Sequence, residues 1–72
     1  MAHYLKINHM RRSDKQVYAV LKASDKPLSL DDLATQADYS RRNIERIISR
    51  LRKEKLVRGV KDERRTVYEP IS

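Results

Sequence analysis

The sequence of 72 residues contains no cysteine, and its 17 lysines and arginines outnumber its 10 aspartates and glutamates to give a net charge of +7. A chain of this length forms one small domain with a marginal apolar core, and no disulfide or thiolate zinc site is available to reinforce it. It has no apolar run of membrane length and no signal-peptide core, so we expect a soluble protein of the cytoplasm. The basic balance, with a pI near 10.1, favours a polyanionic partner.

Residues 1–10 alternate apolar and polar side chains, with Leu5 and Ile7 on the apolar side. This period of two is typical of a short strand or an extended arm, and a frayed terminus is an equally simple interpretation. An ordered arm would cover Leu5 and Ile7 in a homodimer, which also enlarges the buried area of a small domain. His3 and His9 lack a third ligand at a suitable spacing, so we expect no metal site.

The first predicted helix covers about residues 14–23. Ser13 and Gln16 have the spacing of an S-x-x-Q capping box, in which each side chain bonds the backbone of the other residue. The apolar stripe of this helix is typical of a core-facing surface and consists of Val17, Val20 and Leu21. The sequence Asp25-Lys26-Pro27 then ends the helix.

A second helix, near residues 30–37, is predicted by the residues at its start. Ser29 is placed to cap it, and Asp31 and Asp32 lie at the positive end of the helix dipole. The short turn that follows contains Tyr39, which is placed to close over the junction with the next helix.

The third and longest predicted helix covers about residues 41–55 and has Ser40 as its cap. At about 100° per residue, one of its faces is apolar and consists of Ile44, Ile47, Ile48 and Leu51. The opposite face is polar and consists of Arg42, Arg46, Ser49 and Lys53, flanked by Asn43 and Arg50. Two helices joined by so short a turn must cross steeply, so residues 29–56 predict a helix-turn-helix.

The C-terminal part predicts a β-hairpin over residues 57–69. Two β-prone runs, near residues 57–60 and 65–69, enclose a polar stretch that is rich in charge. This stretch supplies three cations, Lys61, Arg64 and Arg65. Its two acids, Asp62 and Glu63, come between them in the sequence.

The order of these residues resembles the winged helix-turn-helix family of DNA-binding domains. The matching residues are Leu33-Ala34, Tyr39-Ser40-Arg41-Arg42, Ile44, Ile48, Leu51 and Leu56-Val57. Within that family the chain looks most like small phage- and plasmid-type transcriptional regulators and the DNA-binding domains of replication initiators. The resemblance implies an α+β, mainly α fold over residues 11–72, with a three-helix core and a C-terminal wing. Asp38 and Lys55 depart from the family, whose members often have glycine at these two helix ends.

In that family the second helix of the motif enters the major groove of DNA by its N-terminal end, which here is residues 40–43. We therefore expect Arg42, Asn43 and Arg46 to contact base edges, since arginine fits guanine and asparagine fits adenine. Ser49 is short enough to contact either a base or a phosphate. The expected phosphate contacts are Arg41, Arg50 and Lys53 on the helix and Lys61, Arg64 and Arg65 on the wing. The acids at the wing tip oppose deep insertion into a groove.

These expectations describe a sequence-specific double-stranded DNA-binding protein, most simply a transcriptional repressor that is associated with the nucleoid. We expect it to need no cofactor and no small-molecule ligand. Two alternatives stay open: an accessory or initiator protein of phage or plasmid DNA replication or recombination, and a winged-helix module that docks onto proteins. A solvated basic face would explain the long helix without any partner, but such faces usually mix both signs. We expect no enzyme, because the sequence shows no nucleophile–base arrangement and no glycine-rich loop.

Overall fold

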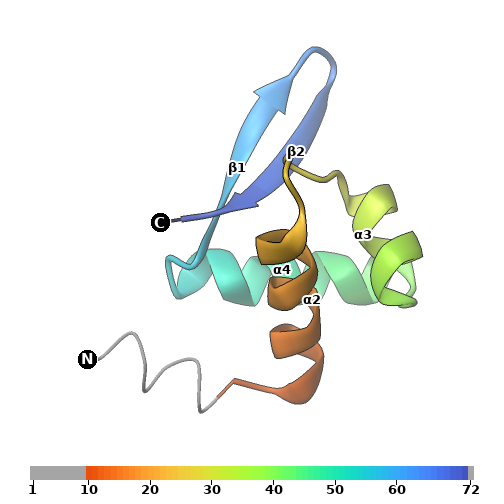
Figure 1. Ribbon diagram of the computed structural model, residues 1–72, viewed down its shortest axis with the longest axis vertical. Coiled ribbons are helices and arrows are strands. Elements are labelled where there is room, and N and C mark those ends of the chain that lie inside the picture. Colours follow the sequence, from red (N-terminus) through yellow and green to blue (C-terminus); the bar gives the residue numbers. More distant parts are fainter. Residues whose placement is uncertain (1–9, 72) are drawn as a thin grey trace.

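The structure, a computed structural model, describes residues 10–71 and places three helices before a two-stranded antiparallel sheet (Figure 1). The elements are α2 (Arg12–Ala23), α3 (Leu30–Ala37), α4 (Arg41–Lys53), β1 (Val57–Asp62) and β2 (Arg65–Pro70). This is the mainly helical α+β winged helix-turn-helix that the sequence predicts. The arm predicted for residues 1–10 lies outside the described residues, apart from Met10.

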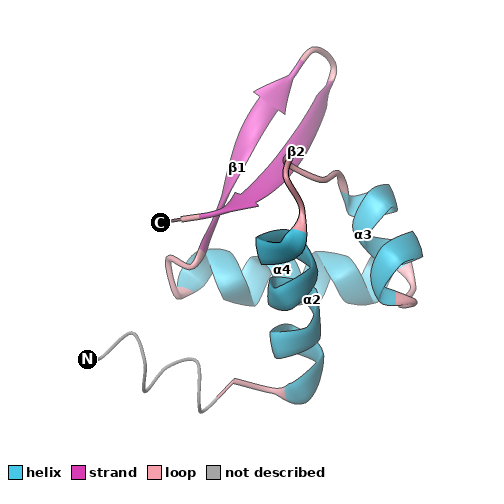
Figure 2. Cartoon of the chain, in the orientation of Figure 1, coloured by secondary structure: helices cyan, strands magenta, loops and turns pink. Residues whose placement is uncertain are grey.

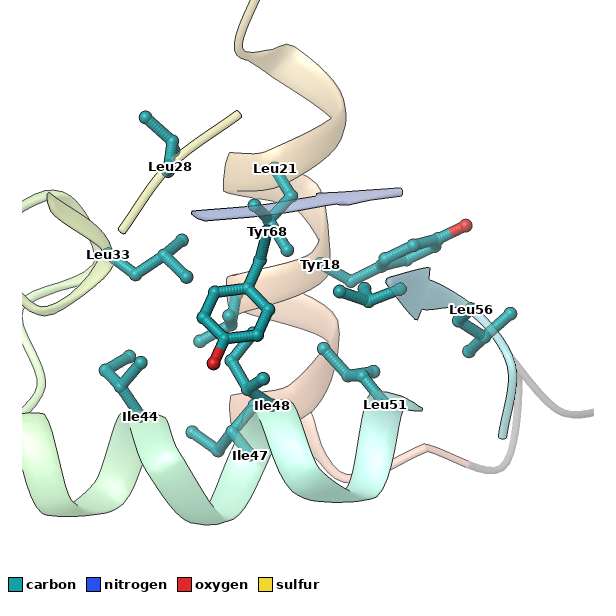
Figure 3. Packing of buried hydrophobic residues seen from close by; sticks show 12 residues of the cluster. Tyr18, Leu21, Leu28, Leu33, Ile44, Ile47, Ile48, Leu51, Leu56 and Tyr68 are labelled. Carbon is teal, nitrogen blue, oxygen red and sulfur yellow. The ribbon is translucent and has the colours of Figure 1, made fainter. Parts of the chain in front are cut away.

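The core lies where the three helices meet the root of the hairpin (Figure 3). The rest of the hairpin projects beyond the helices (Figure 2). Leu21 of α2, Leu33 of α3 and Leu51 of α4 are each at most 1% exposed. Tyr68 extends from β2 toward α4 and closes this cluster (Figure 3). The predicted apolar face of α4 is buried throughout and consists of Ile44, Ile47, Ile48 and Leu51. In residues 10–71 no helix is both long and apolar enough to cross a membrane.

The start of α3 has the predicted cap. The Ser29 hydroxyl accepts a hydrogen bond from the backbone N–H of Asp32 at 3.1 Å, and the Asp32 carboxylate accepts one from the backbone N–H of Ser29 at 3.2 Å. Two of the four unpaired N–H groups at the helix start are therefore satisfied. The hydrogen bonds with Ser29 lower the pKa of Asp32 below its ordinary value.

The capping box predicted for Ser13 and Gln16 is wrong. The first helix begins at Arg12, with Arg11 as an N-cap that makes no side-chain bond. Ser13 therefore lies inside the first turn, where its hydroxyl donates to the Asp14 carboxylate at 3.4 Å. Gln16 instead accepts a hydrogen bond from the hydroxyl of Tyr39. The tertiary contacts of Asp14 with Arg50 and of Gln16 with Tyr39 outweigh the local spacing that suggested a cap.

The end of α4 differs from the prediction by two residues, because the helix stops at Lys53 and not at Lys55. Lys55 adopts a left-handed conformation with φ of 61°. Its N–H bonds the carbonyl of Arg52 at 2.9 Å, and the N–H of Leu56 bonds the carbonyl of Leu51 at 3.0 Å. These two bonds form a Schellman motif, in which glycine usually holds the left-handed position. Asp38, after α3, has a similar φ of 60°.

The hairpin is longer than predicted. Its register pairs Val57 with Pro70 and Asp62 with Arg65, so the turn consists of residues 63–64 alone. Lys61 thus lies within β1 and not in a polar loop. On the outer side of β2, Leu28 and Tyr68 exchange two backbone hydrogen bonds of 2.9 and 2.7 Å, which attach the chain before α3 to the wing.

Candidate nucleic-acid interface

The outward face of α4 is an exposed row of polar side chains. Its members are Arg42, Arg46, Ser49 and Lys53, as the helical period predicts. Ser40 caps the helix as expected, because its hydroxyl accepts a hydrogen bond from the backbone N–H of Asn43 at 3.2 Å. The structure therefore holds the N-terminal end of this row in a regular helical conformation.

Three cations of this face have no acid partner within residues 10–71. Arg42, Arg46 and Lys53 take part in none of the ion pairs of that region, and no hydrogen bond engages their side chains. No ion pair therefore neutralises them in the part of the chain that the structure describes, although Glu45 lines a shallow depression together with Arg42 and Arg46. Such a surface attracts an anion and repels other cations.

Arg41, a predicted phosphate ligand, has an acid partner that is easily displaced. Its guanidinium lies 3.2 Å from the carboxylate of Asp31 in α3, and the two side chains are 60% and 74% exposed. Exposed pairs of this kind contribute about 0–1 kcal/mol, because water and salt screen them. A phosphate can therefore compete for Arg41.

Arg50, the other predicted phosphate ligand on the flank of α4, is held against α2 by a buried acid. Its Nε and Nη2 donate to the two carboxylate oxygens of Asp14 at 2.9 and 2.8 Å. The Asp14 side chain is only 7% exposed, whereas that of Arg50 is 37% exposed. The hydrogen bonds to Asp14 raise the pKa of Arg50 above its ordinary value. Sequence patterns did not predict this pair, because its members belong to different helices.

A shallow depression beside the turn collects several polar groups at the N-terminal half of α4. Asn43 and Arg46 line it from the helix, and Tyr39 lines it from the turn, as its predicted place over the junction implies. Arg11 and Ser13 contribute from the start of α2. Asn43, expected to contact a base, thus lies on the α2 side of the outward face.

The wing cations are exposed but differ in their surroundings. Lys61 and Tyr68 lie on the same face of the hairpin, because Tyr68 pairs with Gly59 and alternate residues of a strand share a face. Arg64 lies in the turn. Arg65 is close enough to Asp32 for their attraction to contribute to the lowered pKa of that carboxyl.

Two residues with a place at this surface were not predicted. Arg52 and Tyr68 line a groove between α4 and the root of the wing, together with Leu30, Glu45, Ile48, Ser49 and Lys53. The position of Arg52 on the helix, about 90° from the centre of the outward face, was available from the sequence. The approach of Tyr68 to α4 was not, since it depends on how the wing packs.

Comparisons with solved structures agree with this fold. No protein-family profile and no curated sequence matches the chain. A point mutant of S. aureus MepR, bound to an oligodeoxyribonucleotide, gives a TM-score of 0.85 at 17% identity and covers 94% of this chain and 52% of that one. The PcaV transcriptional regulator of Streptomyces coelicolor, in complex with its natural ligand, gives 0.81 at 24% identity and covers 99% and 55%. The chain spans about half the length of these two proteins.

An enzyme also contains a domain of this shape. Human N-acetylserotonin methyltransferase, in complex with SAM, matches with a TM-score of 0.74 at 16% identity, covering 83% of this chain and 18% of the enzyme. At identities of 24% and below, these likenesses establish the winged helix-turn-helix fold. The function has to be argued from the surface, because one fold serves several functions.

Proposed function

We propose that the protein is a sequence-specific regulator of transcription that binds double-stranded DNA with the N-terminal half of α4 in the major groove. The distribution of ion pairs along α4 carries this proposal. Arg41 and Arg50 have acid partners, whereas Arg42, Arg46 and Lys53 have none within the described residues. Cations without an ion pair in a row on one helix face repel one another in the free protein, and a polyanion relieves that repulsion.

The roles of these side chains follow from their positions along the helix. Arg42 and Arg46 lie one turn apart near the N-terminal end, and a guanidinium fits the O6 and N7 atoms of guanine. Asn43, between them, fits the N6 and N7 atoms of adenine. Lys53 lies about 10 Å beyond Arg46 along the axis, where a straight helix has left the groove, so we assign it to a phosphate.

The remaining phosphate contacts come from the wing and from the start of α4. Lys61 and Arg64 are exposed cations without an acid partner in the part of the chain that the structure describes. Arg65 is an exposed cation whose charge is partly offset by the nearby Asp32 carboxylate. Arg41 becomes available when its exposed ion pair with Asp31 opens. Ser40 and Ser49 offer hydroxyls, which suit either a phosphate or a base edge.

The likeness to MepR bound to an oligodeoxyribonucleotide supports a nucleic-acid partner, and the likeness to PcaV supports a role in transcription. We propose repression as the mode of action, because a domain bound in a groove excludes other proteins from the same DNA without any further activity. The protein would act in the cytoplasm on the nucleoid, and a homodimer would read two half-sites.

The test is selection of bound duplexes from a random pool, followed by sequencing, with the wild-type protein and Arg46→Ala compared directly. We expect one enriched motif for the wild type and a lost preference at one base pair for the variant. Arg58→Ala is the matched control, because Arg58 lies on the hairpin face opposite to Lys61 and Tyr68 and is paired with Glu69 at 2.6 Å. Half-sites one helical turn apart would indicate a homodimer. The absence of an enriched motif, with equal binding by Arg46→Ala, would overturn the proposal in favour of a protein-docking module.

A further inference from the structure

The groove between α4 and the root of the wing contains a tyrosine hydroxyl without a partner. Tyr68 is 9% exposed, and within residues 10–71 its hydroxyl makes no hydrogen bond. Every side-chain oxygen in that region that is fully sealed from solvent has a hydrogen-bond partner. The Tyr68 hydroxyl has none there, so it must retain some contact with solvent. Tyr68 lines the groove and its hydroxyl is directed toward α4 (Figure 3), so we infer that the hydroxyl is available to whatever occupies the groove.

Gly59 makes room for this tyrosine. It lies directly opposite Tyr68 in the hairpin register. A Cβ at position 59 would lie 3.3 Å from the Tyr68 ring and 3.2 Å from the Thr66 methyl group, which is closer than ordinary contact. The chain has no other glycine. This position therefore allows the Tyr68 ring to pack against β1 while it extends toward α4 (Figure 3).

The positive charge of the groove is concentrated at one end. Arg52 is exposed and forms no ion pair within the described residues. Side chains on a helix lean toward its N-terminus, so Arg52 covers the turn that contains Ile48 and Ser49. Glu45 also lines the groove, but it precedes Arg52 by about 10 Å along the helix axis, so this carboxylate and the guanidinium belong to opposite ends of the groove.

We propose that this groove holds one phosphodiester of the DNA backbone. The hydroxyls of Tyr68 and Ser49 would donate to its anionic oxygens, Arg52 would compensate its charge, and the deoxyribose would contact Leu30 and Ile48. The proposal rests on the function proposed above. If α4 lies in the major groove and the wing meets the adjoining minor groove, the strand that separates the two grooves must pass between α4 and the wing. A donor pair, a guanidinium and an apolar wall occur together at that place.

The test measures binding of the full chain to its preferred duplex, in which one phosphate at a time is replaced by an uncharged methylphosphonate. For the wild type, we expect one phosphate per half-site, on the strand between the two grooves, to give about a ten-fold loss of affinity. For Arg52→Gln, the same replacement should give almost no further loss, while replacements elsewhere keep their effect. Tyr68→Phe should reduce the loss at that phosphate only in part.

Tyr18→Phe is the matched control. Tyr18 is another core tyrosine, 6% exposed, but it belongs to α2 and does not line the groove. This variant should show the wild-type loss at every phosphate, and thermal unfolding verifies that both tyrosine variants fold. If neither Arg52→Gln nor Tyr68→Phe changes the phosphate profile, the groove assignment is overturned while DNA binding stands. If the wild type binds no duplex, the proposed function itself is overturned.

Discussion

Arg50 of α4 and Asp14 of α2 form a two-point ion pair, with 2.9 Å from Nε to Oδ2 and 2.8 Å from Nη2 to Oδ1. Asp14 also lies in the first turn of α2, where the helix dipole favours a negative charge. The pair fixes the start of α2 against the C-terminal half of α4. One arginine of the basic helix therefore serves the fold, and its neighbours on the outward face remain available to a ligand.

Arg50→Ala should lower the free energy of unfolding by about 2 kcal/mol, because it leaves the largely buried Asp14 carboxylate without its partner. Arg46→Ala removes an exposed and unpaired arginine from the same helix, so it should change the free energy by less than about 0.5 kcal/mol. Urea denaturation of both variants at neutral pH measures the difference. Equal losses would show that the ion pair does not contribute to stability.

The cap of α3 should make stability depend on pH in the acid range. Hydrogen bonds with Ser29 hold the pKa of Asp32 below its ordinary value of 3.8. A carboxyl with a lowered pKa in the folded state stabilises the fold above its unfolded pKa and loses this effect as the pH falls through the folded pKa.

We therefore expect the free energy of unfolding to decrease as the pH drops below about 4, and Asp32→Asn to show a shallower decrease. Ser29→Ala should cost about 1 kcal/mol at neutral pH, because the cap is lost. Urea denaturation at a series of pH values provides the measurement. Parallel curves for Asp32→Asn and the wild type would contradict the assignment.

The end of α4 offers a site for stabilisation. Lys55 holds the left-handed conformation of the Schellman motif, which costs a residue with a side chain about 1 kcal/mol. Lys55→Gly should therefore raise the free energy of unfolding by up to about 1 kcal/mol. Arg46→Gly, inside the helix, should lower it by about 1 kcal/mol. Thermal unfolding of the two variants should give shifts of opposite sign, and shifts of the same sign would refute the explanation.

The salt dependence of the proposed DNA binding should distinguish cations that contact a phosphate from cations that stay in an ion pair within the protein. With about five phosphate contacts per protomer, log K should fall with log salt at a slope near −4 to −5. Lys53→Ala should reduce the steepness by about one and weaken all duplexes alike, whereas Arg46→Ala should cost about 1–3 kcal/mol on the preferred duplex. Arg50→Ala, assayed where it remains folded, should leave the slope unchanged. An equal change for Arg50→Ala and Lys53→Ala would mean that the pair with Asp14 opens on DNA.

The sequence predicted the features that depend on neighbours along the chain. The caps at Ser29 and Ser40, the two faces of α4 and the hairpin all follow from local spacing, and the structure contains each of them. Asp38 and Lys55, which depart from the glycine that the family often has at these helix ends, both adopt a left-handed conformation. The nucleic-acid contacts themselves remain predictions.

Features that depend on contacts between residues far apart in the chain could not be predicted from the sequence. Helical periodicity placed Arg50 on the flank of α4, but it contained no information on what lies beside that flank. The capping box at Ser13 had suitable spacing, yet Asp14 is buried and Gln16 bonds Tyr39. The β-prone run around Tyr68 predicted a strand there. That the Tyr68 ring reaches α4 depends on how the wing packs against the helices, which no local pattern describes.

If the protein binds DNA as proposed, the two backbone bonds between Leu28 and Tyr68 would affect which duplexes it selects. They fasten the wing to the segment before α3. Because α3 and α4 share one core, the bonds also restrain the separation between the wing and α4. If the twist of a duplex places its major and minor grooves at a spacing that differs from the separation of α4 and the wing, the duplex must be overwound or unwound before it can contact both elements. That deformation is cheaper for some base-pair steps than for others, so the protein would discriminate among sequences at steps that no side chain touches.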